Sequence, residues 1–248
     1  MFLNAAEQRT LAHCFSLLAQ DLGEREIREQ VGHATLALFK AQHFASYVWN
    51  EDSKVFADQV SINVDPANLD RYTAWYQHHD PITFQLQMRR RATRVSDVMP
   101  RADFLRSEFF NDFLAKDGLH WGINLHAFDG DQALGDLRIW RGRSGTDFET
   151  RDRQLLDLLE PAFEAALRRA RAARRQAAAV ERSPSAASGA GLLSARELEV
   201  AQCVRRGLSD KEIARELAIS VPTVRTYLRR VFEKLGIHRR SGLAQLSG

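Results

Sequence analysis

Arginine and threonine side chains gather on one side of an amphipathic segment near the carboxyl end of the sequence. If the residues that follow Ser220 form a helix, Thr226 and Arg229 point away from its apolar stripe and Arg225 lies on its flank. The stripe consists of Val224, Leu228, Val231 and Leu235. Arginine can form paired hydrogen bonds with guanine in the DNA major groove, and a threonine methyl group can contact the methyl group of thymine. We therefore expect Arg225, Thr226 and Arg229 to reach base edges.

Further polar side chains close to this face could bind DNA without reading its sequence. Lys211, Arg230 and Lys234 are placed to contact phosphates, which supply affinity rather than sequence choice. Tyr227 could donate a hydrogen bond to a phosphate, and Thr223 lies on the flank of the same helix. The alternative interpretation is an ordinary amphipathic helix with a solvated basic face. The complete set predicted to bind DNA is Lys211, Thr223, Arg225, Thr226, Tyr227, Arg229, Arg230 and Lys234.

Three closely spaced helix starts would hold this face in position. The S-x-x-E capping-box pattern, in which both side chains pair with free backbone N–H groups, occurs at residues 194–197 and again at 209–212. A third start lies at Ser220, two positions before Pro222, after a tight turn at residues 218–221. Three such helices, the last rich in arginine, are typical of a helix-turn-helix DNA-binding module.

The same segment closely resembles the LuxR/FixJ (GerE-type) DNA-binding domain over residues 192–240, about a fifth of the chain. The matching elements are Leu193-Ser194, Arg196-Glu197-x-Glu199-Val200, Gly207-x-Ser209-x-Lys211-Glu212-Ile213-Ala214, Leu217-x-Ile219-Ser220, Thr223-Val224-Arg225 and Lys234-Leu235-Gly236-Ile237. The resemblance implies a four-helix module that binds two-fold half-sites as a dimer. It also implies that Arg225, Thr226 and Arg229 occupy the DNA-reading positions of the family. Only residues 241–248 remain for the fourth helix.

In the front part of the chain, the segment Tyr72-x-x-x-Tyr76-x-x-x-Asp80-Pro81 could bind a small molecule. A carboxylate can accept a hydrogen bond from a ligand, but Asp followed by Pro is also a common helix start. Both roles can hold together, because a carboxylate has several lone-pair sites. Aromatic side chains could wall a pocket for an apolar ligand, or they could simply pack as a core. The residues predicted to bind a ligand are Tyr47, Trp49, Tyr72, Tyr76, Asp80 and Trp121.

This segment resembles the Y-x-x-x-D-P element of autoinducer-binding domains that are joined to the same DNA-binding module. The resemblance covers roughly residues 30–170 and implies an α-β-α sandwich of PAS/GAF type with an interior cavity. It also implies that Asp80 accepts a hydrogen bond from the amide of an acyl-homoserine lactone. Two tryptophans of that family are missing, because their positions fall near residues 67–68 and at Val95. We therefore expect a small apolar or amphipathic ligand other than a standard acyl-homoserine lactone.

The sequence offers little support for catalysis or metal binding. His78 and His79 are adjacent, and neighbouring side chains on a helix point about 100° apart, so the pair is poorly placed to share a metal. The sequence contains no G-x-S-x-G, H-E-x-x-H or phosphate-cradling glycine motif. We expect no enzymatic activity, no cofactor and no metal. A front domain that senses by turnover is an alternative without a visible nucleophile–base pair.

Hydrophobic periodicity and turn residues predict a mixed α+β front domain with a small antiparallel sheet of four to six strands. An Asp129-Gly130 turn indicates a hairpin. The apolar side of the last helix, formed by Leu155, Leu158, Leu159, Ala162, Phe163, Ala166 and Leu167, exceeds what a small sheet needs and suggests a dimer element. The predicted helices span residues 5–21, 24–40, 66–76, 80–90, 101–116 and 148–176, and the strands span 43–50, 55–62, 119–128 and 134–141.

Composition separates the chain into a sensor domain (1–176), an Ala/Ser/Gly-rich linker (177–191) and an all-α DNA-binding domain (192–248). Residues 1–167 contain 18 Lys/Arg and 25 Asp/Glu, whereas residues 192–248 contain 11 Lys/Arg and six Asp/Glu. An acidic front joined to a basic end fits a sensor attached to a polyanion-binding module.

Two distant cysteines, the absence of a signal pattern and the absence of an apolar run of ~20 residues favour the reducing cytoplasm and no membrane contact. Together these features predict a homodimeric transcription regulator that binds double-stranded DNA under the control of a small-molecule signal. The alternative within this class is a ligand-independent regulator whose front domain dimerises or binds a partner protein.

Overall fold

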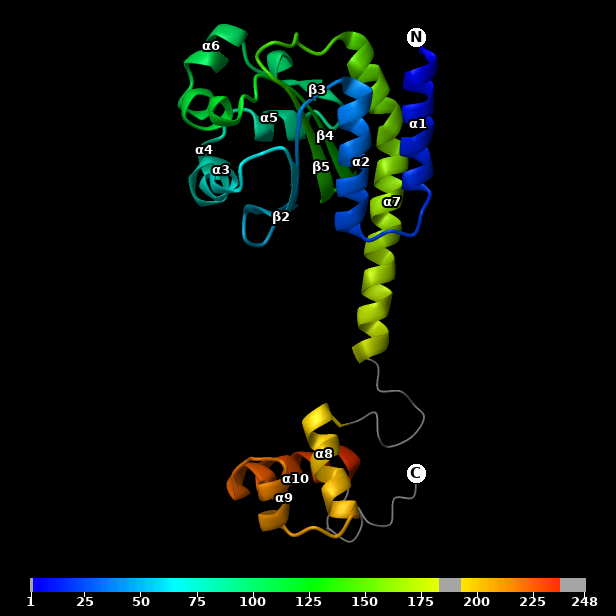
Figure 1. Cartoon of the computed structure of the whole chain (residues 1–248), viewed down its shortest axis with the longest axis vertical. Coiled ribbons are helices and arrows are strands. Elements are labelled where there is room, and N and C mark those ends of the chain that lie inside the picture. Colours follow the sequence, from blue (N-terminus) through cyan, green and yellow to red (C-terminus); the bar gives the residue numbers. More distant parts are fainter. Residues whose placement is uncertain (1, 183–192, 237–248) are drawn as a thin grey trace. The chain divides into compact units, whose positions relative to one another are not determined.

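The computed structural model describes residues 2–182 and 193–236, and the chain divides into two compact units, Met1–Arg175 and Gln176–Gly248. Figure 1 shows the elements of both units, each of which is described here by itself. The first unit contains an antiparallel sheet of five strands in the order β2-β1-β5-β4-β3. These strands are β1 His43–Asn50, β2 Val55–Ile62, β3 Thr93–Arg94, β4 Trp121–Asp129 and β5 Gln132–Arg141.

The hairpin predicted at Asp129-Gly130 is confirmed, because β4 pairs with β5 from Trp121 opposite Arg141 to Asp129 opposite Gln132. Gly130 has a φ of 61°, a left-handed conformation that glycine adopts without steric cost. The two-residue strand β3 was not predicted, since it is too short to show an alternating pattern.

Three long helices cover one face of the sheet: α1 Ala5–Leu18, α2 Glu24–Phe39 and α7 Thr150–Arg182 (Figure 1). Two arginines of α7 bind the other two helices. Arg171 Nε lies 2.9 Å from a carboxylate oxygen of Glu24 in α2, and Arg169 donates to the carbonyl oxygen of Leu18 in α1 at 2.7 Å. The main apolar core lies between these helices and the sheet and includes Val31, Phe44, Leu125, Leu137, Leu156, Leu159 and Phe163.

Shorter helical segments cover the opposite face, which completes the α-β-α sandwich expected from the sequence (Figure 1). They are α3 Pro66–Arg71, a π-helix Tyr72–Tyr76, α4 Gln77–His79, α5 Thr83–Met88, α6 Arg101–Arg106, a second π-helix Phe109–Phe113 and 3₁₀ turns at Val95–Asp97 and Leu114–Asp117. A second, largely aromatic core lies between this layer and the sheet.

Two helices predicted in this layer are shorter than expected. The expected helix 101–116 ends at Arg106, because Ser107 is extended with a ψ of 147° and its hydroxyl oxygen accepts from the N–H of Phe110 at 3.1 Å. Serine often competes in this way with regular helical hydrogen bonding. The expected helix 80–90 starts only at Thr83.

Helix α7 differs from its prediction in two respects. It continues to Arg182, so the predicted linker is wrong for residues 177–182, where alanine and arginine favour a helix. The remaining linker residues, 183–191, lie outside the described part of the chain. Leu158 was placed on the apolar side but is 48% exposed, whereas its neighbours Leu155, Leu159 and Phe163 are buried.

The second unit contains α8 Ala195–Arg205, α9 Asp210–Glu216 and α10 Val221–Leu235 within its described residues. Their apolar residues form one core around Val200, Ile213, Val224, Leu228 and Val231. The predicted fourth helix at residues 241–248 falls outside the described residues. Cys203 is buried in this core and Cys14 in that of the first unit, and both are free thiols.

Candidate DNA interface and interior cavity

Side-chain caps begin α8, α9 and α10, as predicted. The N–H of Ser194 donates to the carboxylate of Glu197, and the N–H of Ser209 donates to that of Glu212, each at 2.7 Å. The hydroxyl oxygen of Ser220 accepts from the N–H of Thr223 at 3.2 Å. Each cap satisfies backbone donors that the helix leaves unpaired, so the helix starts are determined locally.

The apolar stripe of α10 points inward as its spacing predicted. Val224, Leu228 and Val231 are buried and Leu235 is half-buried. Ala218 turns the chain between α9 and α10 with a φ of 52°. Because this stripe packs into the core, the opposite face of α10 is exposed to solvent.

The side chains predicted to read bases lie on that solvent face. Arg225, Thr226, Arg229 and Arg230 are exposed, and Thr223 is half-buried. The Nε atom of Arg225 lies 3.5 Å from the Asp210 carboxylate, a long contact for a side chain that is 73% exposed. An exposed ion pair of this kind contributes little, so the guanidinium can exchange it for a stronger partner.

The other predicted DNA contacts have different surroundings. Lys211 is exposed and Tyr227 is half-buried. Lys234 donates to the Glu197 carboxylate at 2.6 Å, and this bond, together with the N–H of Ser194, lowers the pKa of Glu197 to about 2. Lys234 thus joins the end of α10 to the capping box of α8, and any phosphate contact would compete with this bond.

In the first unit, a small interior cavity of about 30 Å³ lies between the sheet and the layer of short helices. This volume is close to that of one water molecule. The polar side chains that line it are Tyr47, Tyr72, Asp80, Thr83, Asn124 and Arg138. Its apolar lining includes Leu69, Ile82, Phe109, Phe113, Leu119 and Trp140.

Of the six residues predicted to bind a ligand, the structure brings Tyr47, Tyr72 and Asp80 to this cavity. Tyr76 stacks on Phe113 behind the cavity wall, with ring centroids 5.1 Å apart. Trp49 lies apart and donates from Nε1 to Glu51 at 2.9 Å. Trp121 also lies apart, where the guanidinium of Arg101 stacks 3.8 Å from its ring centroid.

Asp80 is buried and acts as a local cap. One carboxylate oxygen accepts from the N–H groups of Ile82 and Thr83 at 2.9 Å each. The other accepts from the Thr83 hydroxyl at 2.5 Å and lies 3.4 Å from the Tyr72 hydroxyl, which can donate to it. Burial raises the pKa of the Asp80 carboxyl, although these hydrogen bonds oppose that shift.

Four buried polar residues on the central strands escaped the sequence prediction. Asn124 and His126 of β4 lie opposite Arg138 and Asp136 of β5 in the hairpin register. Arg138 donates from Nε to Asp136 at 2.8 Å and from Nη1 to the Tyr72 hydroxyl at 2.7 Å. The sequence did carry a signal for this cluster, namely two polar residues two positions apart on each of two otherwise apolar strands. Residues at that spacing point to the same face of a sheet.

The side chain of Asp136 also takes the place of some of the backbone hydrogen bonds between β1 and β5. The backbone pairing of these strands runs only from His43 to Ala45 of β1. Beyond it, the N–H of Tyr47 donates to the Asp136 carboxylate at 2.6 Å. The polar cluster is therefore structural as well as cavity-facing, and burial lowers the pKa of the neighbouring His126 to about 4.

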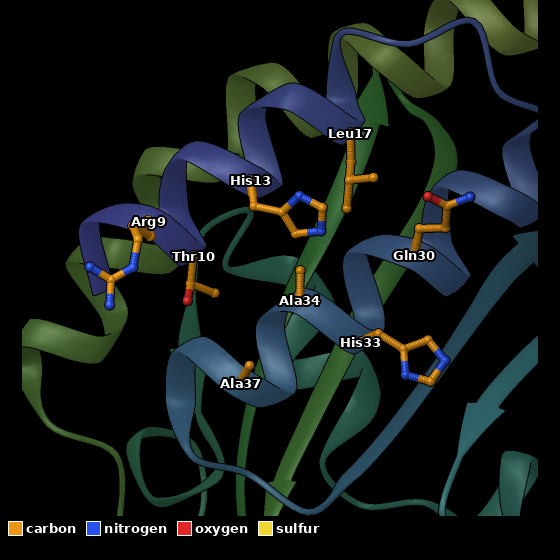
Figure 2. A pocket seen from close by; sticks show the side chains of 8 residues that line it. All are labelled: Arg9, Thr10, His13, Leu17, Gln30, His33, Ala34 and Ala37. Carbon is orange, nitrogen blue, oxygen red and sulfur yellow. The ribbon is translucent and has the colours of Figure 1, made fainter. Parts of the chain in front are cut away.

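A larger but open groove of about 500 Å³ lies on the outer side of this unit, between α1 and α2. Figure 2 shows the side chains that line it: Arg9, Thr10, His13 and Leu17 from α1, and Gln30, His33, Ala34 and Ala37 from α2. Among the described residues, no group of three or more His, Cys, Asp or Glu side chains could hold a metal ion. In the adjacent pair His78-His79, His79 stacks on Trp75 with ring centroids 3.8 Å apart.

Every helix in the part of the chain that the structure describes is too short or too polar to cross a lipid bilayer.

Comparison with known proteins identifies the second unit and the fold of the first. A sequence model described as GerE, bacterial regulatory proteins of the luxR family, matches residues 191–247. The HTH-type transcriptional activator RamA of Corynebacterium glutamicum is 52% identical over 48 residues, which cover 19% of this chain and 17% of RamA. The chain thus matches less than a fifth of that relative's length.

Solved structures share the α-β-α fold at low identity. SdiA in complex with octanoyl-rac-glycerol has a TM-score of 0.50 and 15% identity, over 98% of this chain and 95% of that chain. The GAF domain from a phosphoenolpyruvate-protein phosphotransferase of Coxiella burnetii has a TM-score of 0.53 and 10% identity, over 68% of this chain and 97% of that chain. These matches confirm the expected sandwich.

Proposed function

Because the carboxy-terminal unit is a LuxR-type helix-turn-helix domain, we propose that this chain is a transcription regulator that binds double-stranded DNA through α10. The observation that carries the proposal is the exposed Arg225–Thr226–Arg229 face on a helix whose start and inward stripe are both fixed. The amino-terminal turns of such a helix enter the major groove. A DNA-binding protein of this kind acts in the cytoplasm of a bacterial cell.

Within this proposal, Arg225, Thr226 and Arg229 contact base edges, and Thr223 lies on the flank of this face. The remaining predicted residues, Lys211, Tyr227, Arg230 and Lys234, contact phosphates. Two copies of the chain would place two such helices on half-sites about 34–36 Å apart. The half-exposed Leu158 of α7 supports a homodimer in which this helix contributes to the interface.

We further propose that the first unit senses a small uncharged or amphipathic molecule in its interior cavity. The fold supports this, because SdiA, which shares it, has been solved with octanoyl-rac-glycerol bound. The buried polar groups at the cavity floor support it as well, since packed cores rarely keep them without a partner. The ligand would shift the equilibrium between arrangements of the two DNA-binding units.

A second function is favoured by the cavity's small volume. A front unit with room for about one water molecule could serve only to dimerise the chain or to bind a partner protein. The two functions differ in whether any small molecule changes DNA affinity.

DNA reading is tested by selecting bound duplexes from a randomised pool with the full chain. The wild type should enrich a two-fold symmetric motif. The R225A/R229A variant should lose that enrichment, whereas R205A, which removes one charge from the exposed end of α8, should retain it. Enrichment of the same motif by R225A/R229A would overturn the proposed reading face.

Sensing is tested with the selected duplex and octanoyl-rac-glycerol. Under the sensor proposal this probe raises the melting temperature of the first unit and changes the dissociation constant for DNA. No change in either quantity favours the ligand-independent function.

A further inference from the structure

The floor of the interior cavity carries two buried polar side chains with unsatisfied atoms. Asn124 is 1% exposed and Arg138 is 5% exposed, and both line the cavity. The Oδ1 atom of Asn124 and the Nη2 atom of Arg138 have no hydrogen-bond partner among residues 2–182 and 193–236. A buried polar atom without a hydrogen-bond partner destabilises the fold, so the retention of the Asn124 oxygen above all indicates a partner that enters the cavity.

These two atoms belong to neighbouring side chains. Asn124 of β4 lies directly opposite Arg138 of β5 in the antiparallel register, so their Cβ atoms are about 5 Å apart. Asn124 Oδ1 can only accept a hydrogen bond, and Arg138 Nη2 can only donate one. A bound group that satisfies both must therefore offer a donor and an acceptor a few ångströms apart.

Asp80, the expected anchor, has little capacity left for a ligand. A carboxylate offers about four lone-pair sites. The N–H groups of Ile82 and Thr83, the Thr83 hydroxyl and the Tyr72 hydroxyl are placed to occupy them. A ligand amide could reach Asp80 only by displacing one of these donors.

The charge of Arg138 is already balanced by Asp136, and the lone-pair sites of Asp80, the second carboxylate at the cavity, are taken by local donors. Arg138 Nη2 lies 2.8 Å from an Asp136 carboxylate oxygen, an ionic contact that balances its charge but lacks hydrogen-bond geometry. A carboxylate ligand would meet Asp136 and Asp80 with no additional cation, and an ammonium ligand would meet the guanidinium. Burying a further unpaired charge is far more costly than burying a neutral polar group.

We propose that Asn124 and Arg138 are the residues that select the ligand of this cavity, and that they select an uncharged head with an adjacent donor and acceptor, such as a carboxamide. This inference rests on the proposed sensor function and names the chemistry of its site. The present cavity has room for about one water molecule, so such a head must displace part of the lining to enter. An attached alkyl chain enters by displacing the aromatic wall, where Phe113 and Tyr72 stack 5.4 Å apart on the two π-helices.

The test uses the full chain and three probes of equal length: hexanamide, hexanoate and hexylamine. Thermal unfolding of the first unit is followed at matched probe concentrations. Hexanamide should raise the melting temperature of the wild type by about 2 °C or more in a concentration-dependent manner. Hexanoate and hexylamine, each of which lacks one hydrogen-bonding function and carries a charge, should leave it unchanged.

Two variants distinguish a role of Asn124 in ligand recognition from a purely structural role. Asn124→Leu keeps the side-chain size and removes the unsatisfied oxygen, so it should preserve or raise the melting temperature of the free protein while abolishing the hexanamide shift. Asp80→Asn keeps the acceptor for the Ile82 and Thr83 N–H groups and should retain the hexanamide shift. A purely structural Asn124 would not produce this split between stability and response.

The possible results distinguish a failure of the proposed ligand selectivity from a failure of the proposed sensor function. A shift with hexanoate or hexylamine in place of hexanamide, or a hexanamide shift that survives in Asn124→Leu and is lost in Asp80→Asn, overturns the inference and leaves small-molecule sensing intact. The absence of a shift with all three probes overturns the inference. If octanoyl-rac-glycerol is also without effect, the sensor function fails with it.

Discussion

Replacing only one member of the buried ion pair Arg138–Asp136 should strongly lower the free energy of unfolding of the first unit. Arg138 is 5% and Asp136 2% exposed, and Arg138→Met leaves the carboxylate buried without its cation. Breaking a buried pair in this way costs about 3–5 kcal/mol. For a unit of this size, each kcal/mol lowers the melting temperature by about 2–4 °C, so the expected fall is about 6–20 °C.

The double variant R138M/D136N makes the reasoning testable. The D136N change would keep an amide oxygen as acceptor for the Tyr47 N–H, which now donates to Asp136 at 2.6 Å, and would remove the carboxylate that R138M leaves without its cation. The remaining loss is mainly the Arg138–Tyr72 hydrogen bond and should be about 1–2 kcal/mol. Urea unfolding of the full chain, followed through the first unit's transition, measures both variants. A double variant no more stable than R138M would refute the argument that an unpaired charge causes the loss.

Three further predictions concern other parts of the chain. Ser220→Ala should destabilise the second unit by about 1 kcal/mol through loss of the α10 cap, measured by its thermal transition; an unchanged transition would contradict the capping role. His126 has a folded pKa of about 4 against 6.5 unfolded, so protons favour the unfolded state. Stability should therefore fall by about 2 kcal/mol from pH 7 to pH 5 in urea titrations, and a slope unchanged in His126→Gln would argue against this group. Gly32→Ala should cost about 1–3 kcal/mol, because a Cβ atom there would lie 2.6 Å from the Phe44 ring; a neutral substitution would show that the ring can move away.

The features that sequence reasoning predicted well depend on neighbours along the chain. Each cap joins residues three positions apart, as in Ser209 and Glu212, and the inward stripe of α10 follows from helical spacing. The hairpin at Asp129-Gly130 is equally local. For this reason the solvent-facing side of α10 could be derived from residues close together in the chain.

Predictions that required packing information were less successful. The aromatic residues Trp49 and Trp121 satisfy the same compositional pattern as Tyr47 and Tyr72, but they lie outside the cavity. The pattern cannot separate them, because a residue's distance from a cavity depends on how layers stack. Ser107 broke a predicted helix through a single side-chain hydrogen bond.

The amino-acid sequence by itself determined the helix starts, the central hairpin and the outward arginine face of α10, since caps, turns and periodicity act over a few residues. Only the tertiary structure decided that Asp80 is occupied by local donors, and that Asn124 and Arg138 meet at the cavity floor. The physical reason is that hydrogen-bond satisfaction in a buried site is a property of the whole environment. Each donor or acceptor there is paired or left unpaired by residues distant in the chain.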